Sequence, residues 1–165
     1  MPEAHIVLNA MNPEDAGAAL TRCCGASRWV TSMLARRPWL SAAALHADAD
    51  EIWRRLDGTD FREAFAQHPR IGGSDGDRDR DGWASQEQAR VGEAGQEIRS
   101  ALRAANDRYF QRFGYIFIVC ATGRSAEELL ALLQDRLDNE PARELAIAAA
   151  EQARITHLRL DKVGA

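Results

Sequence analysis

Apolar residues recur along most of the chain at spacings of three and four, which is the period of one face of a helix. Ile52, Trp53 and Leu56 share one such face, and Phe61 and Phe65 share another. The pattern predicts an all-α fold, a helical bundle of about seven to nine helices.

Helix starts are predicted where a polar residue able to cap backbone N–H groups precedes a helical pattern. Asn12 has the fullest signal, because Pro13 fits the first helical position and two acidic residues follow. The other expected caps are Ser27, Ser41, Asp60 and Ser125.

Helix ends are expected at a glycine or ahead of a proline. These positions are Cys24-Gly25, the residues before Pro38 and Pro69, Gly114, and Asn139 with Pro141. A single long helix is therefore predicted from about Ser85 to about Phe113, and a last helix from about Pro141 to about Leu160.

Residues 115–121, "YIFIVCA", have the β-branched and aromatic content of a strand. No comparable second strand is evident, so this one has nothing to pair with. We predict a short extended segment that is buried within the helical domain. Its backbone donors and acceptors must then find other partners, and some of them are available to a ligand.

The length of 165 residues suits one domain, predicted over residues 1–165. The net charge of −4 is spread along the chain without a basic run, which argues against nucleic acid as a partner. No stretch is long and apolar enough for a membrane span, and no secretory signal precedes the helices. Three cysteines without a CxxC spacing favour a reduced, cytoplasmic compartment.

Residues 77–88, "DRDRDGWASQEQ", begin like a calcium-binding loop, with alternating aspartates and a glycine in sixth place. The twelfth position is Gln88, however, where a calcium loop has a bidentate glutamate, and Arg78 and Arg80 repel a cation. A calcium-binding helical module is therefore the weaker alternative. The composition of residues 72–82 indicates a solvated, mobile loop. One interpretation of its place between His68 and Glu87 is a partial cover for a pocket.

His68, in "AQHPRIGG", is the first candidate for chemistry, because it follows a helix end and precedes a rigid proline. Its near-neutral pKa range suits a proton donor or acceptor. The alternative is a surface histidine that interacts with the carboxyl end of the helix. The other histidines, His5 in the tail, His46 and His157, are weaker candidates.

Glu87 and Gln88 are expected in the first turn of the long helix, where a carboxylate is stabilised by the helix dipole without any further role. Their functional interpretation is that they face a ligand held over that helix end. Arg159 lies beside the apolar stripe of the last helix, either as a carboxylate-binding residue or as a solvated side chain.

Asn106 is an unusual residue for a helix interior, and a hydrogen bond to loop backbone would explain it. Tyr109, three residues later, is expected in the core.

The sequence contains no HExxH, P-loop, dinucleotide fingerprint or GxSxG motif, so we expect chemistry without a metal or an organic cofactor.

Four motifs in order, "HPRIGG", "SQEQ", "NDRYFQRFGYIFIVCATGRSAEEL" and "ITHLRL", resemble the 2-oxo-4-hydroxy-4-carboxy-5-ureidoimidazoline (OHCU) decarboxylase family over roughly residues 10–162. The resemblance implies an all-helical homodimer that acts in urate degradation. It implies that a small-molecule substrate, the ureidoimidazoline, loses carbon dioxide to give (S)-allantoin. No metal and no organic cofactor are implied.

The resemblance also assigns residues to roles. His68 matches the catalytic histidine, and Glu87 and Arg159 match catalytic residues that contact the substrate. The implied substrate-binding residues are Pro69, Ser85, Gln88, Phe117, Ile118, Val119, Cys120 and Ala121.

The chain departs from the family pattern at one position. The family serine that precedes the Glu-Gln pair corresponds to Ala84, and Ser85 follows one residue later. Either Ser85 replaces that serine or the hydroxyl contact is absent.

A non-catalytic helical interaction protein remains the other alternative, for which a large exposed apolar patch is the expected sign.

Overall fold

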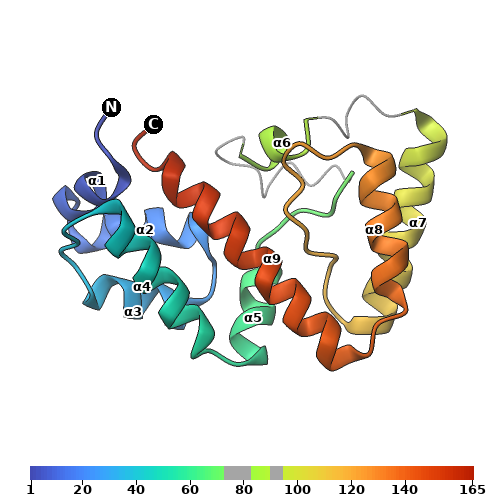
Figure 1. Cartoon of the computed structure of the whole chain (residues 1–165), viewed down its shortest axis with the longest axis horizontal. Helices are drawn as coiled ribbons and strands as arrows, with labels where there is room; N and C mark the ends of the chain where they lie inside the picture. Colours follow the sequence, from blue (N-terminus) through green and yellow to red (C-terminus); the bar gives the residue numbers. More distant parts are fainter. Residues whose placement is uncertain (73–82, 90–94) are drawn as a thin grey trace. The chain divides into compact units, whose positions relative to one another are not determined.

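The structure is a computed structural model that describes residues 1–72, 83–89 and 95–165 (Figure 1). Within these ranges the chain is helical and forms no strand, which confirms the all-α prediction. No helix among these residues is long and apolar enough to cross a membrane. The helices are α1 (Ala4–Ala10), α2 (Pro13–Cys23), α3 (Ser27–Ala35), α4 (Ala42–Arg54), α5 (Gly58–Phe65), α6 (Trp83–Glu87), α7 (Gln96–Phe113), α8 (Ala126–Leu137) and α9 (Pro141–Lys162).

The contacts divide the chain into two compact units, the first formed by Met1–Ala64 with Gln152–Ala165 and the second by Phe65–Glu151. In the first unit α2 packs on α3 and α3 on α4. Its core contains the fully buried side chains of Leu8, Leu20, Trp29, Met33 and Leu45. The prediction of a single domain over residues 1–165 stays a prediction.

Helix α1 was missed, because a seven-residue helix has little stability of its own and the sequence prediction left His5 in a tail. In the structure His5 and Leu8 are buried. Arg37 Nη1 donates to the carbonyl oxygens of Leu8 and Met11, at 2.7 and 2.9 Å. The helix is thus held by tertiary contacts that its own sequence does not reveal.

Three of the five predicted helix caps are confirmed. The side chains of Asn12, Ser41 and Ser125 accept hydrogen bonds from backbone N–H groups in the first turns of α2, α4 and α8. Satisfying these otherwise unpaired donors fixes where each helix begins.

The predicted caps at Ser27 and Asp60 are wrong. Ser27 is the first residue of α3, and its N–H and hydroxyl both donate to Glu63. Asp60 lies in the first turn of α5, whereas Asp57 accepts from the N–H groups of Thr59 and Asp60. At the start of α3 the acceptor is the carboxylate of Glu63 instead of the hydroxyl of Ser27. At the start of α5 it is the carboxylate of Asp57 instead of that of Asp60.

Two histidines join α4 to the carboxyl-terminal part of α9 within the first unit. The rings of His46 and His157 stack, with centroids 4.5 Å apart. Each ring is paired with an aspartate of the other helix, His46 Nε2 with Asp161 at 2.8 Å and His157 Nε2 with Asp50 at 2.7 Å. These contacts give both histidines a packing role.

In the second unit α7 packs against α8 over most of its length. The core of this unit contains the fully buried side chains of Leu102, Tyr109, Phe117, Leu129 and Leu133. Tyr109 is therefore a core residue, as predicted. Its ring meets the ring of Phe117 edge to face, with centroids 5.4 Å apart.

The long helix predicted from about Ser85 to about Phe113 is wrong as a single element. The structure shows α6, which ends at Glu87, a turn at Gln88-Ala89, and α7, which begins at Gln96. Gly92 and Gly95 lie in the connecting sequence, and each costs about 1 kcal/mol inside a helix. Gly95 is the N-cap residue of α7, with extended backbone.

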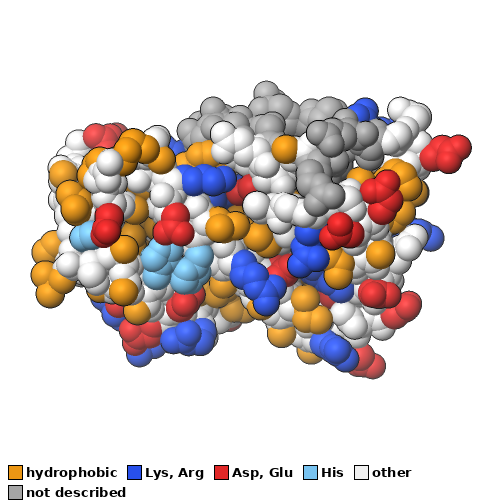
Figure 2. All heavy atoms as spheres, turned by 45° about the horizontal axis from the view of Figure 1, so that its top comes forward, with side chains coloured by type: hydrophobic (Ala, Val, Ile, Leu, Met, Phe, Trp, Pro, Cys, Tyr) orange, Lys and Arg blue, Asp and Glu red, His pale blue; other side chains and the backbone are white. Residues whose placement is uncertain are grey.

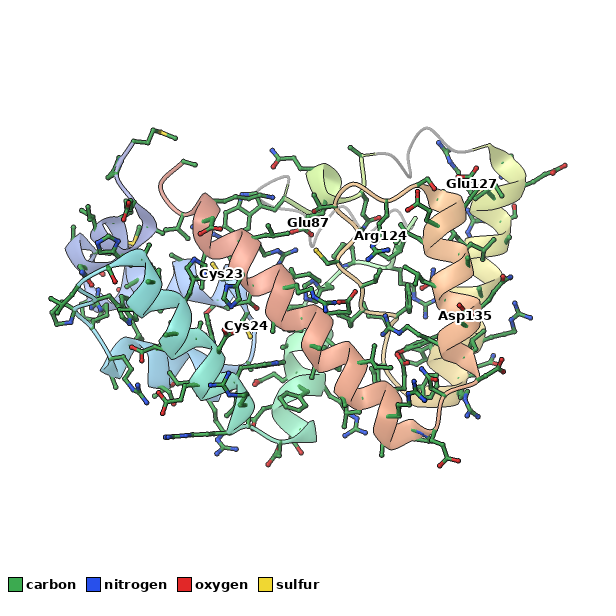
Figure 3. The ribbon with its side chains drawn as sticks, in the orientation of Figure 1. Cys23, Cys24, Glu87, Arg124, Glu127 and Asp135 are labelled. Atoms are coloured by element: carbon green, nitrogen blue, oxygen red, sulfur yellow. The ribbon has the colours of Figure 1, made fainter. Side chains whose placement is uncertain are left out.

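The three cysteines are free thiols, and Cys23 and Cys24 are buried next to each other at the end of α2 (Figure 3). Burial raises the pKa of the Cys24 thiol to about 12. A thiol that stays protonated at neutral pH is a poor nucleophile, so Cys24 has a packing role.

We expect the replacement of two glycines by alanine to change the stability of the protein in opposite directions. Gly114 ends α7 with a φ of 82°, so Gly114→Ala should destabilise the protein by about 1–2 kcal/mol. Gly17 lies inside α2, and a Cβ there meets Leu34 at an ordinary 3.5 Å, so Gly17→Ala should stabilise it by roughly 0.5–1 kcal/mol. Urea unfolding of both variants tests this, and two changes of the same sign would contradict it.

Candidate active site

His68 lies in the turn after α5 and is buried, with 7% of its surface exposed. Its backbone N–H donates to the carbonyl oxygen of Phe65 at 3.2 Å, which continues the last turn of the helix. Pro69 follows and is half-buried. This burial contradicts the alternative in which His68 is a surface histidine at the helix end. The role of His68 in chemistry stays a prediction.

Asn106 of α7 holds the segment that follows His68. Its Nδ2 donates to the carbonyl oxygen of Ile71 at 3.2 Å and to that of Leu102, one turn back, at 2.9 Å. The side chain is buried, so the predicted hydrogen bond to loop backbone is confirmed. Arg70 is also paired with α7, through Asp107 at 2.5 Å. The chain that follows His68 is thus tied to α7 at Arg70 and at Ile71.

Glu87 and Gln88 do not begin a long helix. Glu87 is the last residue of α6 and is partly exposed (Figure 3), and Gln88 lies in the turn that follows. The helix-dipole explanation for Glu87 therefore fails, because a carboxylate at the carboxyl end of a helix gains nothing from the dipole. A role of Glu87 in ligand binding stays a prediction from the resemblance.

Gln88 connects α6 to the segment that carries His68. Its Oε1 accepts a hydrogen bond from the N–H of Gly72 at 3.0 Å, and Gly72 has a φ of 75°, which favours glycine. Gly72 and Gln88, distant in sequence, are therefore neighbours in the second unit. That His68 and the Glu-Gln pair act on one substrate stays a prediction from the resemblance.

The segment 115–121 is extended and buried, which confirms the prediction from its composition. The side chains of Phe117, Ile118, Val119 and Ala121 are almost completely buried, and Cys120 is half-buried. At its start the ring of Tyr115 packs on Phe65, the last residue of α5, with centroids 5.1 Å apart. The segment therefore begins next to the helix that leads to His68.

Side chains supply the hydrogen bonds that a neighbouring strand would supply in a sheet. Arg136 Nη1 donates to the carbonyl oxygen of Ile118 at 2.8 Å, and the N–H of Cys120 donates to Glu151 at 3.4 Å. Arg124, in the turn before α8 (Figure 3), donates through Nε to the carbonyl oxygen of Cys120 at 3.2 Å. Sequence reasoning missed all three of these charged residues, because each occurs in a helical or turn pattern typical of a surface.

Arg159 belongs to the first unit, whereas the other candidate residues belong to the second. It is partly exposed, and its Nη1 donates to the carbonyl oxygen of Arg22 in the last turn of α2 at 3.1 Å. This contact satisfies a helix-end carbonyl group and gives Arg159 a structural role. A role toward substrate stays a prediction from the resemblance.

Two sequence hypotheses concern residues outside the described part of the chain. The proposed mobile cover at residues 72–82 and the aspartates of the calcium-like stretch lie almost wholly in residues 73–82, and the side chains of Ala84 and Ser85 are also outside it. The backbone of Ser85 belongs to α6. Among the residues that are described, no group of histidines, cysteines and acidic residues is arranged to hold a metal ion.

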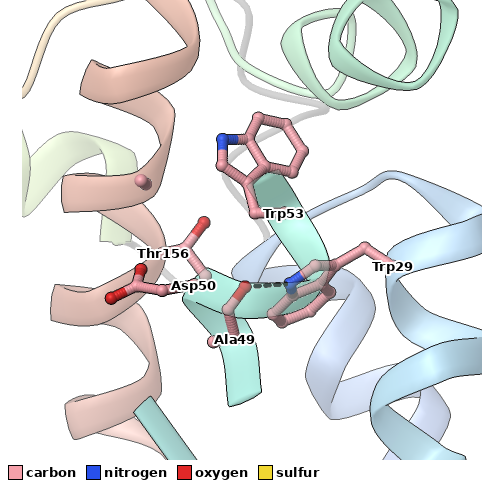
Figure 4. Close-up of a pocket in the computed structure, with 6 residues that line it drawn as sticks. Trp29, Ala49, Asp50, Trp53 and Thr156 are labelled. Atoms are coloured by element: carbon pink, nitrogen blue, oxygen red, sulfur yellow. Dashed lines mark hydrogen bonds between the residues drawn. The ribbon is translucent and has the colours of Figure 1, made fainter. Parts of the chain in front are cut away.

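A pocket in the first unit is lined by Trp29, Ala49, Asp50, Trp53, Ala153 and Thr156 (Figure 4). It is too narrow to admit a water molecule, and Trp29 Nε1 donates across it to the carbonyl oxygen of Ala49 at 3.1 Å. We interpret it as a packing feature. On the face shown in Figure 2, acidic and basic side chains are intermixed.

Comparison with known proteins gives a consistent result. The sequence profile of the family described as OHCU decarboxylase matches residues 9–161. The chain is 34% identical over 145 residues to the uric acid degradation bifunctional protein TTL of Arabidopsis thaliana, covering 86% of this chain and 45% of that protein. It is 31% identical over 132 residues to the 2-oxo-4-hydroxy-4-carboxy-5-ureidoimidazoline decarboxylase of Amia calva, covering 77% of this chain and 74% of that protein.

A solved structure has a similar fold. The crystal structure of an OHCU decarboxylase in the presence of (S)-allantoin matches with a TM-score of 0.78 and 33% identity, covering 92% of this chain and 97% of that chain. The chain thus spans less than half of the Arabidopsis relative and nearly all of the solved decarboxylase.

We expect Asn106→Ala to destabilise the protein by roughly 1–3 kcal/mol, because it leaves the buried carbonyl group of Ile71 without its donor. Urea unfolding measures the change. Arg103→Ala on the exposed side of the same helix is the control and should change stability by less than about 0.5 kcal/mol. Equal changes in the two variants would show that the hydrogen bond to Ile71 contributes nothing.

Proposed function

The chain belongs to the OHCU decarboxylase family, and we propose that it removes carbon dioxide from OHCU to give (S)-allantoin in urate degradation. It would then be a carbon–carbon lyase that acts on a small molecule. The observation that carries the proposal is the match to the OHCU decarboxylase family over residues 9–161. The burial of His68 and the hydrogen bond that joins Gly72 to Gln88 in the same unit support it.

Decarboxylation of this substrate requires that the electron pair of the broken carbon–carbon bond move into the conjugated imine of the ring. The bond breaks most easily when the carboxylate is held out of the ring plane, where it overlaps the π system. Fixing the substrate in that conformation can lower the barrier by several kcal/mol, about the contribution of orientation in other enzymes. The electron acceptor is part of the substrate, so we propose that the reaction needs no metal or organic cofactor.

We propose that His68 polarises the 4-hydroxyl group of the substrate or exchanges a proton with it, since imidazole is suited to both roles near neutral pH. Glu87 is proposed to accept hydrogen bonds from ring or ureido nitrogens, and Arg159 to bind an anionic or carbonyl oxygen. Protonation of the ring from one face then fixes the S configuration of the product.

The substrate-binding surface is proposed to include Pro69 and Gln88, together with Ser85 if its hydroxyl replaces that of the family serine. The rest of the surface is proposed to come from the segment Phe117, Ile118, Val119, Cys120 and Ala121. The hydrogen bond between Gln88 and Gly72 supports the first part, because it keeps the two turns in contact. We also propose that the protein is a homodimer in the cytoplasm. The free thiols agree with that compartment.

The proposed activity has a direct assay. Urate is oxidised and hydrolysed in situ to the ureidoimidazoline, the protein is added, and the circular dichroism of allantoin is followed. The proposal predicts fast formation of the S enantiomer. Slow formation of racemic allantoin at the rate without protein would refute it.

His68→Ala should lower the rate of (S)-allantoin formation by about 10²- to 10⁴-fold, the usual contribution of a proton-transferring side chain. The matched control is His157→Ala, because His157 pairs with Asp50 in the first unit and has no proposed contact with substrate. Circular dichroism in the far ultraviolet verifies that both variants fold. A folded His68→Ala protein with turnover close to that of the unmodified chain would exclude His68 from the reaction.

A further inference from the structure

We propose that Arg136 is a positioning residue for this reaction, and that its buried ion pair with Glu144 fixes Phe117 and Ile118 of the substrate-binding segment. The inference rests on the proposed function, in which that segment lines the site. In this proposal neither charged residue touches the substrate. Their effect is transmitted through the backbone and ring that Arg136 contacts.

Arg136 makes two contacts with adjacent residues of the segment. Its Nη1 donates to the carbonyl oxygen of Ile118 at 2.8 Å, and its guanidinium lies over the ring of Phe117, 4.5 Å from the centroid. The residue is only 7% exposed, although an arginine in helix α8 has the pattern of a surface residue. One planar cation thus fixes both the direction of a peptide group and the position of the neighbouring ring.

Glu144 of α9 holds the guanidinium in that orientation. It is fully buried, and its Oε2 accepts from Arg136 Nε at 2.9 Å and from Nη2 at 2.6 Å. The hydroxyl of Tyr109 donates to the same oxygen, and Asn139 Nδ2 donates to Oε1 at 3.0 Å. Burial, together with the hydrogen bond to Glu144, raises the pKa of the Tyr109 hydroxyl, which therefore remains a donor.

Stabilisation of the fold alone is a poor explanation for the buried ion pair of Arg136 and Glu144, because burying two charges is costly. Removing an ion pair from water costs about as much as the pair returns, and apolar residues of similar volume often stabilise a core equally well or better. What apolar residues cannot supply is a donor for the carbonyl group of Ile118. Because the segment has no neighbouring strand in the described part of the chain, that donor decides how the peptide group is oriented.

Two further contacts limit movement on the other side of Val119. Glu151 accepts a hydrogen bond from the N–H of Cys120, and Arg124 donates one to the carbonyl oxygen of Cys120. The segment is therefore fixed at Ile118 and at Cys120, and Val119 lies between the two fixed positions. Loss of the Arg136 contact would release one end of this short stretch. A shift of about 1 Å in a substrate-positioning group can lower a rate by about a hundredfold.

The test separates positioning from stability. The triple variant Tyr109→Phe/Arg136→Met/Glu144→Leu replaces the buried polar groups with apolar ones of similar size. We expect the urea midpoint to fall by less than in a variant that truncates a large core side chain, because apolar groups replace the ion pair and the main loss is the donor to Ile118. Amide hydrogen exchange in residues 117–121 should become faster by about tenfold or more. The value of kcat/KM for (S)-allantoin formation should fall by about ten- to a hundredfold.

Met33→Ala is the opposite control, because Met33 is fully buried on α3 and has no proposed contact with the substrate or with the segment 117–121. It should lower the urea midpoint, while exchange in residues 117–121 and kcat/KM stay within about twofold of the unmodified values at temperatures where it is folded. If the triple variant does not fold, Arg136→Lys replaces it. An ammonium group keeps the charge but cannot satisfy Ile118 and Glu144 together, so faster exchange and lower kcat/KM are again expected.

A folded variant with unchanged exchange in residues 117–121, or with unchanged kcat/KM, would overturn the inference. An unmodified protein without decarboxylase activity would instead refute the proposed function. The exchange measurement does not depend on activity, so it still decides whether the ion pair fixes the segment.

Discussion

A buried extended backbone without a neighbouring strand is the constraint on which the second unit depends. Most of its residues are buried, and leaving buried N–H and carbonyl groups unpaired costs as much as a lost hydrogen bond. Helices α8 and α9 meet this requirement with charged side chains, Arg136 to Ile118 and Glu151 to Cys120. Those side chains need counter-charges in turn, and Glu144 with Tyr109 completes the arrangement for Arg136. The helices are thus arranged around one irregular segment.

The same principle of side chains fixing irregular backbone applies to the turns that carry the proposed chemistry. Asn106 holds Ile71, and Gln88 holds Gly72, so the stretch after His68 is tied both to α7 and to the end of α6. The backbone next to His68 is thus held in place without belonging to a helix. An enzyme that relies on orienting its substrate, instead of on a cofactor, requires this kind of rigidity in its loops.

Local signals in the sequence predicted much of the fold. Helical spacing, the caps at Asn12, Ser41 and Ser125, the glycine at 114 and the composition of residues 115–121 all gave correct elements. The failures concern tertiary contacts. Helix α1 depends on Arg37, the start of α3 depends on Glu63, and the charged partners of the extended segment come from helices later in the chain. His68 and the Glu-Gln pair were identified by resemblance, while the position of Glu87 at the end of α6 was not predicted from its spacing.

We propose that His68, the turn at Glu87-Gln88 and the segment 117–121 form one binding surface for the ureidoimidazoline and its product. Titration of the isotope-labelled protein with (S)-allantoin, followed by amide chemical shifts, tests this most directly, because it reports binding residue by residue without requiring turnover. We expect saturable shifts at His68, Gln88 and residues 117–121, with the amides of α3 unchanged. Saturable binding that leaves these amides unshifted and perturbs another region would contradict it.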